Sequence, residues 1–249
     1  MSVKKIKIPS EIAYVLFLTV LAFAVSLSAA ADFGVSMIVG PAYILSLKLG
    51  FVTFGQAEII VQSIMFIVFC ILMRGVKLVY FSSFATCLIY SFILDGWRAA
   101  IPALNPDVTA PGSFPMWERI VFFVLSVVLT SIAVSGLFKV YLYPQVYDFF
   151  VKGITLRFGI DTAKFKRCFD AGCFLTALAM TLIFFRSIKG IGIGTVIITL
   201  LNGIIIGWCL RLWERFVEFP PIAKKFAAHF EIEQVNRKEN ESSSDEGSV

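Results

Sequence analysis

The chain has 249 residues, of which 58% are hydrophobic and only 16% are charged, and its net charge at pH 7 is +5. Soluble globular chains carry charge on about a quarter of their residues, so this composition excludes a soluble domain, a collagen and a disordered regulator. With a mean hydropathy of +0.86, the chain is predicted to be an all-α polytopic membrane protein embedded in the lipid bilayer.

The cysteine and histidine content argues against metal and disulfide chemistry. The five cysteines lie inside or beside apolar segments and have no CxxC spacing: Cys70, Cys87, Cys168, Cys173 and Cys209. The single histidine is His229, near the C-terminus, so we expect no metal site and no cofactor. Lys and Arg form no basic stripe interleaved with exposed aromatic residues, which argues against nucleic acid as a partner.

Six apolar runs, with their flanking residues, are long enough to cross about 30 Å of hydrocarbon as helices. The predicted spans cover approximately residues 12–31, 56–73, 78–95, 119–139, 168–186 and 190–211. The first span is too long for the apolar part of a signal peptide and others follow it, so we expect it to be retained.

Residues 34–49 form an additional apolar segment, which contains Gly40-Pro41 and Lys48. The residue before a proline avoids the α conformation, so a straight helix through this point is disfavoured. We favour a short interfacial element, with a re-entrant segment or a full span as the alternatives.

Composition also divides the chain into halves and a tail. Residues 101–117 contain four prolines, which predicts an extended external loop. This loop separates a first three-helix half, residues 1–100, from a second, residues 118–213. Residues 214–235 are expected to form a cytoplasmic amphipathic segment on the membrane surface. Residues 236–249 are rich in Ser and Glu and are expected to be disordered.

The distribution of Lys and Arg predicts the orientation. With six spans and a cytoplasmic N-terminus, the cytoplasmic segments contain 17 of these residues and the external segments contain 5. Cytoplasmic loops of membrane proteins carry an excess of positive residues, so both termini are expected in the cytoplasm.

The two halves resemble each other in sequence. A shift of 104 residues aligns Tyr43 with Tyr147, and a shift of 111 residues aligns Gly96 with Gly207. Because each half has an odd number of spans, the second half would be inverted relative to the first. Many secondary transporters are built in this way, with a site near the membrane midplane between the repeats. Chance similarity between apolar segments is the alternative.

Three stretches resemble a known family: residues 31–43, residues 54–56 and above all GIGIGTVIITLLNG at residues 190–203. Together they look like the bacterial YczE/YitT-type integral membrane proteins, over about residues 12–213. The resemblance implies a bacterial inner-membrane protein with five or six spans and no well-established activity.

Polar residues within the spans are the main candidates for a site, because charges at membrane depth are costly and usually face a cavity or a partner. Glu58 opens the second span, and Gln62 lies one turn further on the same face. Ser91 and Asp95 are likewise one turn apart at the end of the third span. For each carboxylate taken alone, we favour a location in the headgroup region over a binding role.

The last span begins with the glycine-rich stretch that contains Gly192, Gly194 and Thr195. Backbone N–H groups at such a helix start attract anions, although close helix packing is the interpretation that we favour. Asn202 lies in the middle of this span, where a helix–helix hydrogen bond and a ligand contact are both open. We expect the third and last spans to meet and to line one ligand pocket with these residues: Ser91, Asp95, Gly194, Thr195 and Asn202.

Three classes of function follow. We favour a small-solute transporter or permease-like protein that binds an unidentified small molecule. The alternative is a non-catalytic membrane subunit that binds a protein partner or a second copy of the chain, including the substrate-binding subunit of an ATP-driven importer. The sequence has no G-x-S-x-G elbow and no nucleophile–base pair in its spans, so an enzyme, including one acting on lipids, is not predicted.

Overall fold

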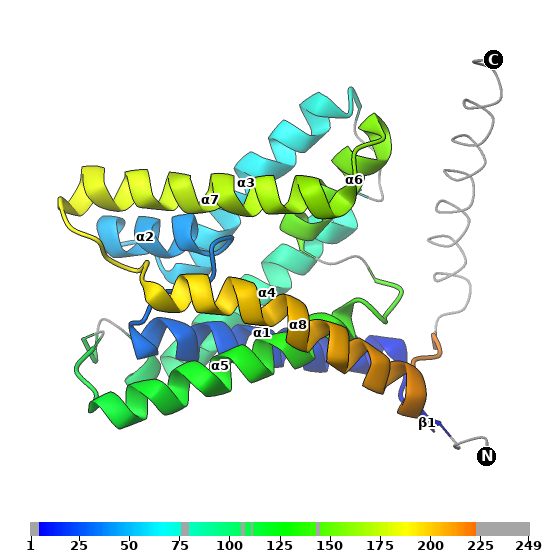
Figure 1. The fold of residues 1–249 in the computed structure, drawn as a ribbon, viewed down its shortest axis with the longest axis horizontal. Coiled ribbons are helices and arrows are strands. Elements are labelled where there is room, and N and C mark those ends of the chain that lie inside the picture. Colours follow the sequence, from blue (N-terminus) through cyan, green and yellow to red (C-terminus); the bar gives the residue numbers. More distant parts are fainter. Residues whose placement is uncertain (1–4, 76–79, 106–107, 111, 143–144, 223–249) are drawn as a thin grey trace.

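The computed structural model describes residues 5–75, 80–105, 108–110, 112–142 and 145–222, which are almost entirely helical (Figure 1). The helices are α1 (Ser10–Ala31), α2 (Gly40–Leu49), α3 (Phe54–Leu72), α4 (Tyr80–Ala100), α5 (Met116–Leu137), α6 (Val146–Phe158), α7 (Thr162–Phe185) and α8 (Ile193–Phe216), with a 3-10 turn η1 (Pro102–Leu104). Two short strands, β1 (Ile6–Lys7) and β2 (Val217–Glu218), pair in parallel. The predicted all-α class is confirmed.

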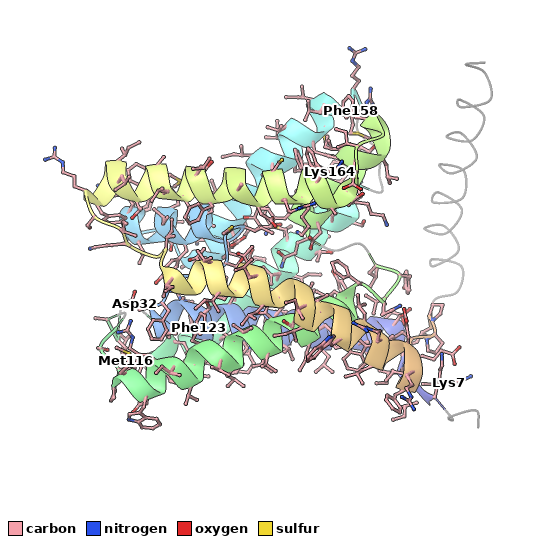
Figure 2. All side chains as sticks on the ribbon, in the orientation of Figure 1. Lys7, Asp32, Met116, Phe123, Phe158 and Lys164 are labelled. Carbon is pink, nitrogen blue, oxygen red and sulfur yellow. The ribbon has the colours of Figure 1, made fainter. Side chains whose placement is uncertain are left out.

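Within the described residues, five helices are long and apolar enough to cross a membrane: α1, α3, α5, α7 and α8. Their outer faces expose large apolar side chains (Figure 2), such as Ile183 on α7 and Ile193 on α8, each 74% exposed. Exposing such apolar surfaces to water is unfavourable, whereas the hydrocarbon of a bilayer solvates them well. These features are those of an integral membrane protein.

The remaining predicted span, residues 78–95, corresponds to α4 from Tyr80 onward; residues 78–79 lie outside the described residues. Helix α4 buries polar side chains, including Ser83, Thr86 and Ser91. It packs against α1, α3 and α6, so its polar face is covered by protein.

The segment at residues 34–49 contains a helix of ten residues, α2, and not a span. Proline is favoured in the first turn of a helix, where its missing N–H leaves no hydrogen bond unmade. Gly40-Pro41 therefore begins the helix, and Gly50, with a φ of +49°, follows its end. Ten helical residues extend only about 15 Å. Helix α2 packs against α3 and α7, and Ala42, Tyr43 and Ile44 are buried.

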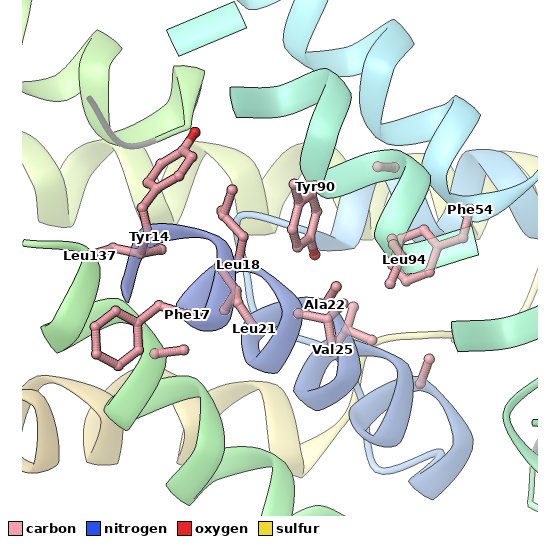
Figure 3. Close-up of a cluster of buried hydrophobic side chains, with 14 of the residues drawn as sticks. Tyr14, Phe17, Leu18, Leu21, Ala22, Val25, Phe54, Tyr90, Leu94 and Leu137 are labelled. Atoms are coloured by element: carbon pink, nitrogen blue, oxygen red, sulfur yellow. The ribbon is translucent and has the colours of Figure 1, made fainter. Parts of the chain in front are cut away.

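The most extensive helix–helix contact in the structure is that between α1 and α5, which lie in the lower part of Figure 1. Gly136 of α5 permits this approach, because a Cβ atom at this position would meet the ring of Phe17. Helix α4 packs on α1, and α8 packs on α5. The main hydrophobic cluster surrounds α1 (Figure 3), with Leu18 and Ala22 fully buried against residues of its neighbours.

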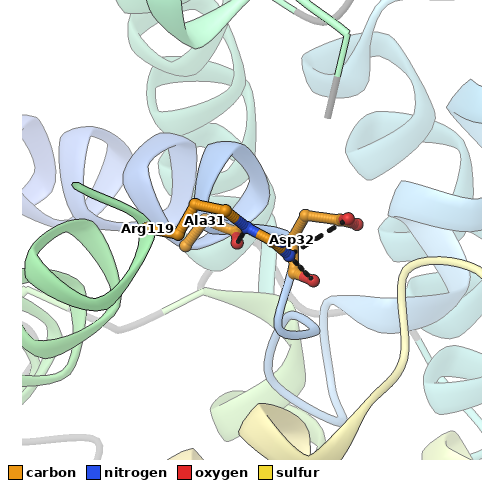
Figure 4. Close-up of polar contacts among 3 residues, drawn as sticks. All are labelled: Ala31, Asp32 and Arg119. Carbon is orange, nitrogen blue, oxygen red and sulfur yellow. Dashed lines mark hydrogen bonds and ion pairs between the residues drawn. The ribbon is translucent and has the colours of Figure 1, made fainter. Parts of the chain in front are cut away.

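Hydrogen bonds to the backbone hold neighbouring segments together at each end of the helical core. Strands β1 and β2 pair, and Ser10 N donates to Pro220 O at 3.0 Å. At the opposite end of α1, Arg119 in the first turns of α5 donates to Ala31 O and Asp32 O, each at 2.9 Å (Figure 4). The start of α1 and the end of α8 therefore lie together, and the end of α1 lies beside the start of α5.

The predicted cytoplasmic segment, residues 214–235, is described only in part. Helix α8 extends to Phe216 and is followed by β2. Residues 223–235 and the tail expected to be disordered, residues 236–249, lie outside the described residues, as do residues 106–107 and 111 of the predicted external loop.

Candidate functional site

A buried polar cluster joins α3 to the start of α6. Glu58 and Gln62 of α3 are both 0% exposed. Gln62 Nε2 donates to Glu58 Oε2 at 2.9 Å, and the Tyr147 hydroxyl of α6 donates to the same oxygen at 3.1 Å. The pair predicted on one face of the second span is therefore completed by a side chain from the second half of the chain.

The position of this cluster follows from the local structure of the two helices. Glu58 and Gln62 are one turn apart, so both point from the same face of α3. Val146 is the first residue of α6, where backbone N–H groups lack partners within the helix. Its N–H donates to Gln62 Oε1 at 3.3 Å. The start of α6, with its partial positive charge, thus lies against the side chains that surround the Glu58 carboxyl.

Three buried atoms on the helices of this cluster have no hydrogen-bond partner: Glu58 Oε1, Ser91 Oγ of α4 and Nε2 of Gln145, the residue before α6. Cys87 and Tyr90 of α4, which are also buried, lie within electrostatic reach of Glu58. Among the described residues, no Lys or Arg forms an ion pair with Glu58. A buried carboxyl without a cationic partner is costly to keep charged, so this site favours proton or cation chemistry.

Asp95 is a helix cap in the structure. Its carboxylate accepts from Thr53 Oγ1 at 2.5 Å and from Gly55 N at 2.8 Å, at the start of α3. Gly55 is required there, because a Cβ atom would lie 2.6 Å from the Asp95 carboxylate and would also meet Ser91 O. Asp95 thus anchors the first turn of α3 and stabilises its positive end.

The glycine-rich start of α8 packs backbone against backbone with the segment after α1. Gly194 N donates to Phe33 O at 2.9 Å, and a Cβ atom on Gly34 would lie 2.5 Å from Gly192 N. Thr195 Oγ1 accepts from Gly192 N at 3.2 Å. The N–H groups of Gly192 and Gly194, which a bound anion would use, are therefore already satisfied within the chain.

The expected pocket between the third and last spans is not formed. Helix α4 packs against α1, α3 and α6, whereas α8 packs against α5. Asn202 Oδ1 accepts from Ser131 Oγ of α5 at 3.1 Å, which is a helix–helix hydrogen bond. Ser91 and Asp95 therefore lie in a different part of the molecule from Gly194, Thr195 and Asn202. The physical reason is that α4 and α8 pack on different members of the α1–α5 pair.

The sequence match extends over this whole arrangement. The model of a family of unknown function, DUF6198, matches residues 8–211. The chain belongs to the DUF6198 family. No curated protein and no solved structure matches the chain. No match links this DUF6198 protein to the YczE/YitT-type proteins, and that resemblance stays a prediction.

Sequence reasoning did not assign a role to Tyr147 of the DUF6198 protein, although the repeat alignment singled it out. Nor did it identify the ion cluster next to it on α6 and α7. There, Lys166 Nζ lies 3.4 Å from Asp148 Oδ1 and 3.8 Å from Asp170 Oδ1. The spacing of Lys166 and Asp170, four residues apart on a helix, was the available signal.

The structure also contains a small pocket. It lies between the end of α1, helix α2 and the segment around η1, and it is lined by Ala29, Ala30, Tyr43, Ala103, Leu104, Thr109 and Phe114. This lining is mostly apolar and includes none of the predicted site residues.

Proposed function

We propose that this protein is a small-solute transporter of the bacterial inner membrane, built from two inverted repeats of three spans and one short helix each. The repeats are α1–α4 and α5–α8. The observation that carries the proposal is the pattern of helix packing. Helix α4 packs on α1 as α8 packs on α5, and α2 packs on α3 and α7 as α6 packs on α7 and α3. A two-fold axis between α1 and α5 would produce these matched pairs.

The position of the chain ends supports six spans. The pairing of β1 with β2 brings the start of α1 and the end of α8 together, which requires an even number of crossings. Five helices are apolar enough to cross a membrane, and α4, with 21 residues, is long enough to be the sixth. Its polar side chains are tolerated because neighbouring helices cover them. The excess of Lys and Arg in the segments at this end favours the cytoplasm for both termini.

The short helices support the inversion. Tyr43 of α2 packs on Phe54, the first residue of α3, with ring centroids 5.1 Å apart. Phe149 of α6 packs on Phe69, near the end of α3, at 5.0 Å. These two contacts are 15 residues apart along α3, which corresponds to about 22 Å. Repeats of inverted topology would place their short helices at opposite ends of the bundle in this way. Pro144, which the repeat hypothesis paired with Pro41, lies outside the described residues.

The two halves differ in two helix pairs. Helix α4 contacts α6, but in the part of the chain that the structure describes α8 does not pack on α2. Helix α3 packs along α4, but among the described residues α7 does not pack along α8. In transporters with inverted repeats, one half rocks or opens against the other during alternating access. We infer that the second conformational state exchanges the two arrangements, so that α7 and α8 close while α3 and α4 separate.

Transport is tested with the full chain in proteoliposomes. The vesicles are exposed to a mixture of isotope-labelled amino acids, sugars and nucleobases, and the contents are analysed by mass spectrometry. We expect time-dependent uptake of one class of solute above that of empty vesicles.

A cross-link tests the proposed movement of α3 against α4. The rings of Phe66 and Phe84 lie 5.4 Å apart, so Phe66→Cys and Phe84→Cys can be cross-linked in a background without other cysteines. The link would hold the two helices together and should therefore abolish uptake.

The matched control is a cross-link between Ile6→Cys and Val217→Cys, which face each other in the strand pair and should permit uptake. If no solute enters and both cross-linked variants behave alike, the transporter proposal fails. A membrane subunit that binds a protein partner would then be the better description.

A further inference from the structure

The Glu58 cluster has an uneven hydrogen-bond pattern. Both side-chain donors, Gln62 Nε2 and the Tyr147 hydroxyl, reach Oε2, while Oε1 has no partner. A carboxylate that is permanently charged and structural usually has donors on both oxygens when it is fully buried. Here one oxygen is left free in a position that water does not reach.

No cation among the described residues compensates this carboxyl. Helices α2, α4 and α6 pack against α3. The titratable groups that interact with Glu58 are Cys87, Tyr90 and Tyr147, and those that interact with Tyr90 or Tyr147 in turn are Asp95 and Cys173. None of these is basic. The Arg98 guanidinium of α4 lies over the Phe54 ring at 5.3 Å, at the start of α3. Lys166 is paired with Asp148 and Asp170.

We propose that Glu58 is a reversible proton-binding site, whose free oxygen Oε1 takes up one proton to form the neutral carboxylic acid. Protonation forms the Oε1–H bond and breaks one O–H bond of a hydronium ion that reaches the site, which becomes water, and release of the proton reverses both changes. A Na⁺ or divalent ion would need several oxygen ligands. The described residues contain no group of three or more His, Cys, Asp or Glu that could hold a metal ion, and replacing choline by Na⁺ in the test below distinguishes a proton from a cation held by other oxygen atoms.

The neighbours of Glu58 stabilise its charged form as well. Two hydrogen bonds to Oε2 and the positive end of α6 favour the carboxylate, while complete burial favours the neutral acid. These opposing effects act on one group, so neither form is fixed by the surroundings. The geometry is that of a site that can release the proton when water or a conformational change reaches it.

This site also connects the two halves of the chain. Glu58 and Gln62 belong to α3, whereas Tyr147 and the Val146 N–H belong to α6. Protonation removes the charge to which the Tyr147 hydroxyl donates, and it therefore weakens the contact between α3 and α6. If the protein is the transporter proposed above, Glu58 is the group through which a proton gradient drives movement of one half against the other. The proton binding itself does not rest on that proposal.

The test is infrared difference spectroscopy of the purified full chain in lipid, recorded as the pH is raised. We expect a carbonyl stretch of a protonated carboxylic acid that disappears with increasing pH in the wild type and is absent from Glu58→Gln. The matched control is Asp148→Asn, which should retain the band. Tyr147→Phe removes one donor to the carboxylate, so the midpoint of the band should move to higher pH by roughly one to two units.

Three results would overturn the proposal: a Glu58→Gln spectrum identical to that of the wild type, a Tyr147→Phe midpoint that does not move, or a midpoint that moves when Na⁺ replaces choline. The Tyr147→Phe variant retains Glu58, so it tests the site even if Glu58→Gln fails to fold.

Coupling of proton binding to transport is measured separately, as acidification of pyranine-loaded proteoliposomes on addition of the solute mixture. Solute uptake without acidification would overturn the coupling role, whereas an intact infrared band without solute uptake would leave the proton site and reject the transporter.

Discussion

Replacing Asp95 by alanine should destabilise the start of α3. The carboxylate accepts from Thr53 Oγ1 and from Gly55 N, and a hydrogen bond to a charged group contributes about 1.5–3 kcal/mol. The two bonds share one carboxylate that is only half-buried, so they will not be additive, and water can reach the freed donors. We expect a loss of about 2–3 kcal/mol for Asp95→Ala. Asp95→Asn, which keeps one acceptor oxygen, should lose about half as much.

This loss is measurable as a change in melting temperature. Domains of 150–250 residues shift by about 2–4 °C per kcal/mol, which predicts a decrease of roughly 4–12 °C for Asp95→Ala. Unfolding of the detergent-solubilised protein is followed with a thiol-reactive dye that reports exposure of the buried Cys87, in a Cys168→Ser background because Cys168 is exposed in the folded protein.

Comparing Thr53→Val with Asp95→Ala shows whether Asp95 is a helix cap or a ligand-binding residue. If Asp95 caps α3, Thr53→Val should also lower the melting temperature, and the double variant Thr53→Val/Asp95→Ala should lose less than the sum of the single variants. A melting temperature of Asp95→Ala within 1 °C of the wild type would refute the capping role. It would return Asp95 to the ligand-binding role that its position near the end of a span first indicated.

Three further predictions test the packing and the ends of the helices. Gly55→Ala should lower stability by about 1–3 kcal/mol, because its Cβ would meet backbone and carboxylate atoms, whereas Gly203→Ala should be silent in the same thermal assay, since nothing lies within 4 Å of its Cβ. Asn202→Leu should lower the melting temperature without altering solute uptake, because Asn202 bonds to α5; full stability with lost uptake would contradict this. Burial raises the pKa of Asp32, and the Arg119 guanidinium opposes that rise. A carboxyl whose pKa is raised in the folded protein stabilises the fold at low pH, and this stability is lost as the pH increases. Arg119 offsets that loss by interacting with the charged form of Asp32. The decrease in melting temperature caused by Arg119→Met should therefore be larger at pH 7 than at pH 4.5, and an equal decrease at both pH values would contradict this prediction.

The sequence predicted what depends on local spacing. Five of the six predicted spans correspond to helices that are long and apolar enough to cross a membrane, and the pairing of Glu58 with Gln62 follows from their separation of one helical turn. The Gly40-Pro41 pair predicted an interruption of the apolar segment at residues 34–49, and α2 begins there. In each case the relevant atoms lie within a few residues of one another, so the helical repeat determines their arrangement.

The contacts that the sequence did not reveal join distant segments of the chain. Asp95 bonds to residues about 40 positions earlier, and without that contact its place at a span end resembles that of a pocket residue. Tyr147 is 89 positions from Glu58. The shared pocket between α4 and α8 was inferred by aligning the halves, but alignment shows which helices are equivalent and does not show which ones touch.

If the two halves are the inverted repeats proposed above, equivalent contacts differ in chemistry, and this difference bears on the proposed proton site. The contact of α3 with α6 contains Glu58 and Tyr147, whereas its counterpart, the contact of α2 with α7, is apolar and includes Ile44 and Ala177. The acidic residue of α7, Asp170, instead has Lys166 as a partner. A repeat architecture that duplicated its function would retain an uncompensated carboxyl in both halves. With only one such carboxyl among the described residues, the expected stoichiometry is one proton per conformational cycle, carried by the first half and released through its contact with the second.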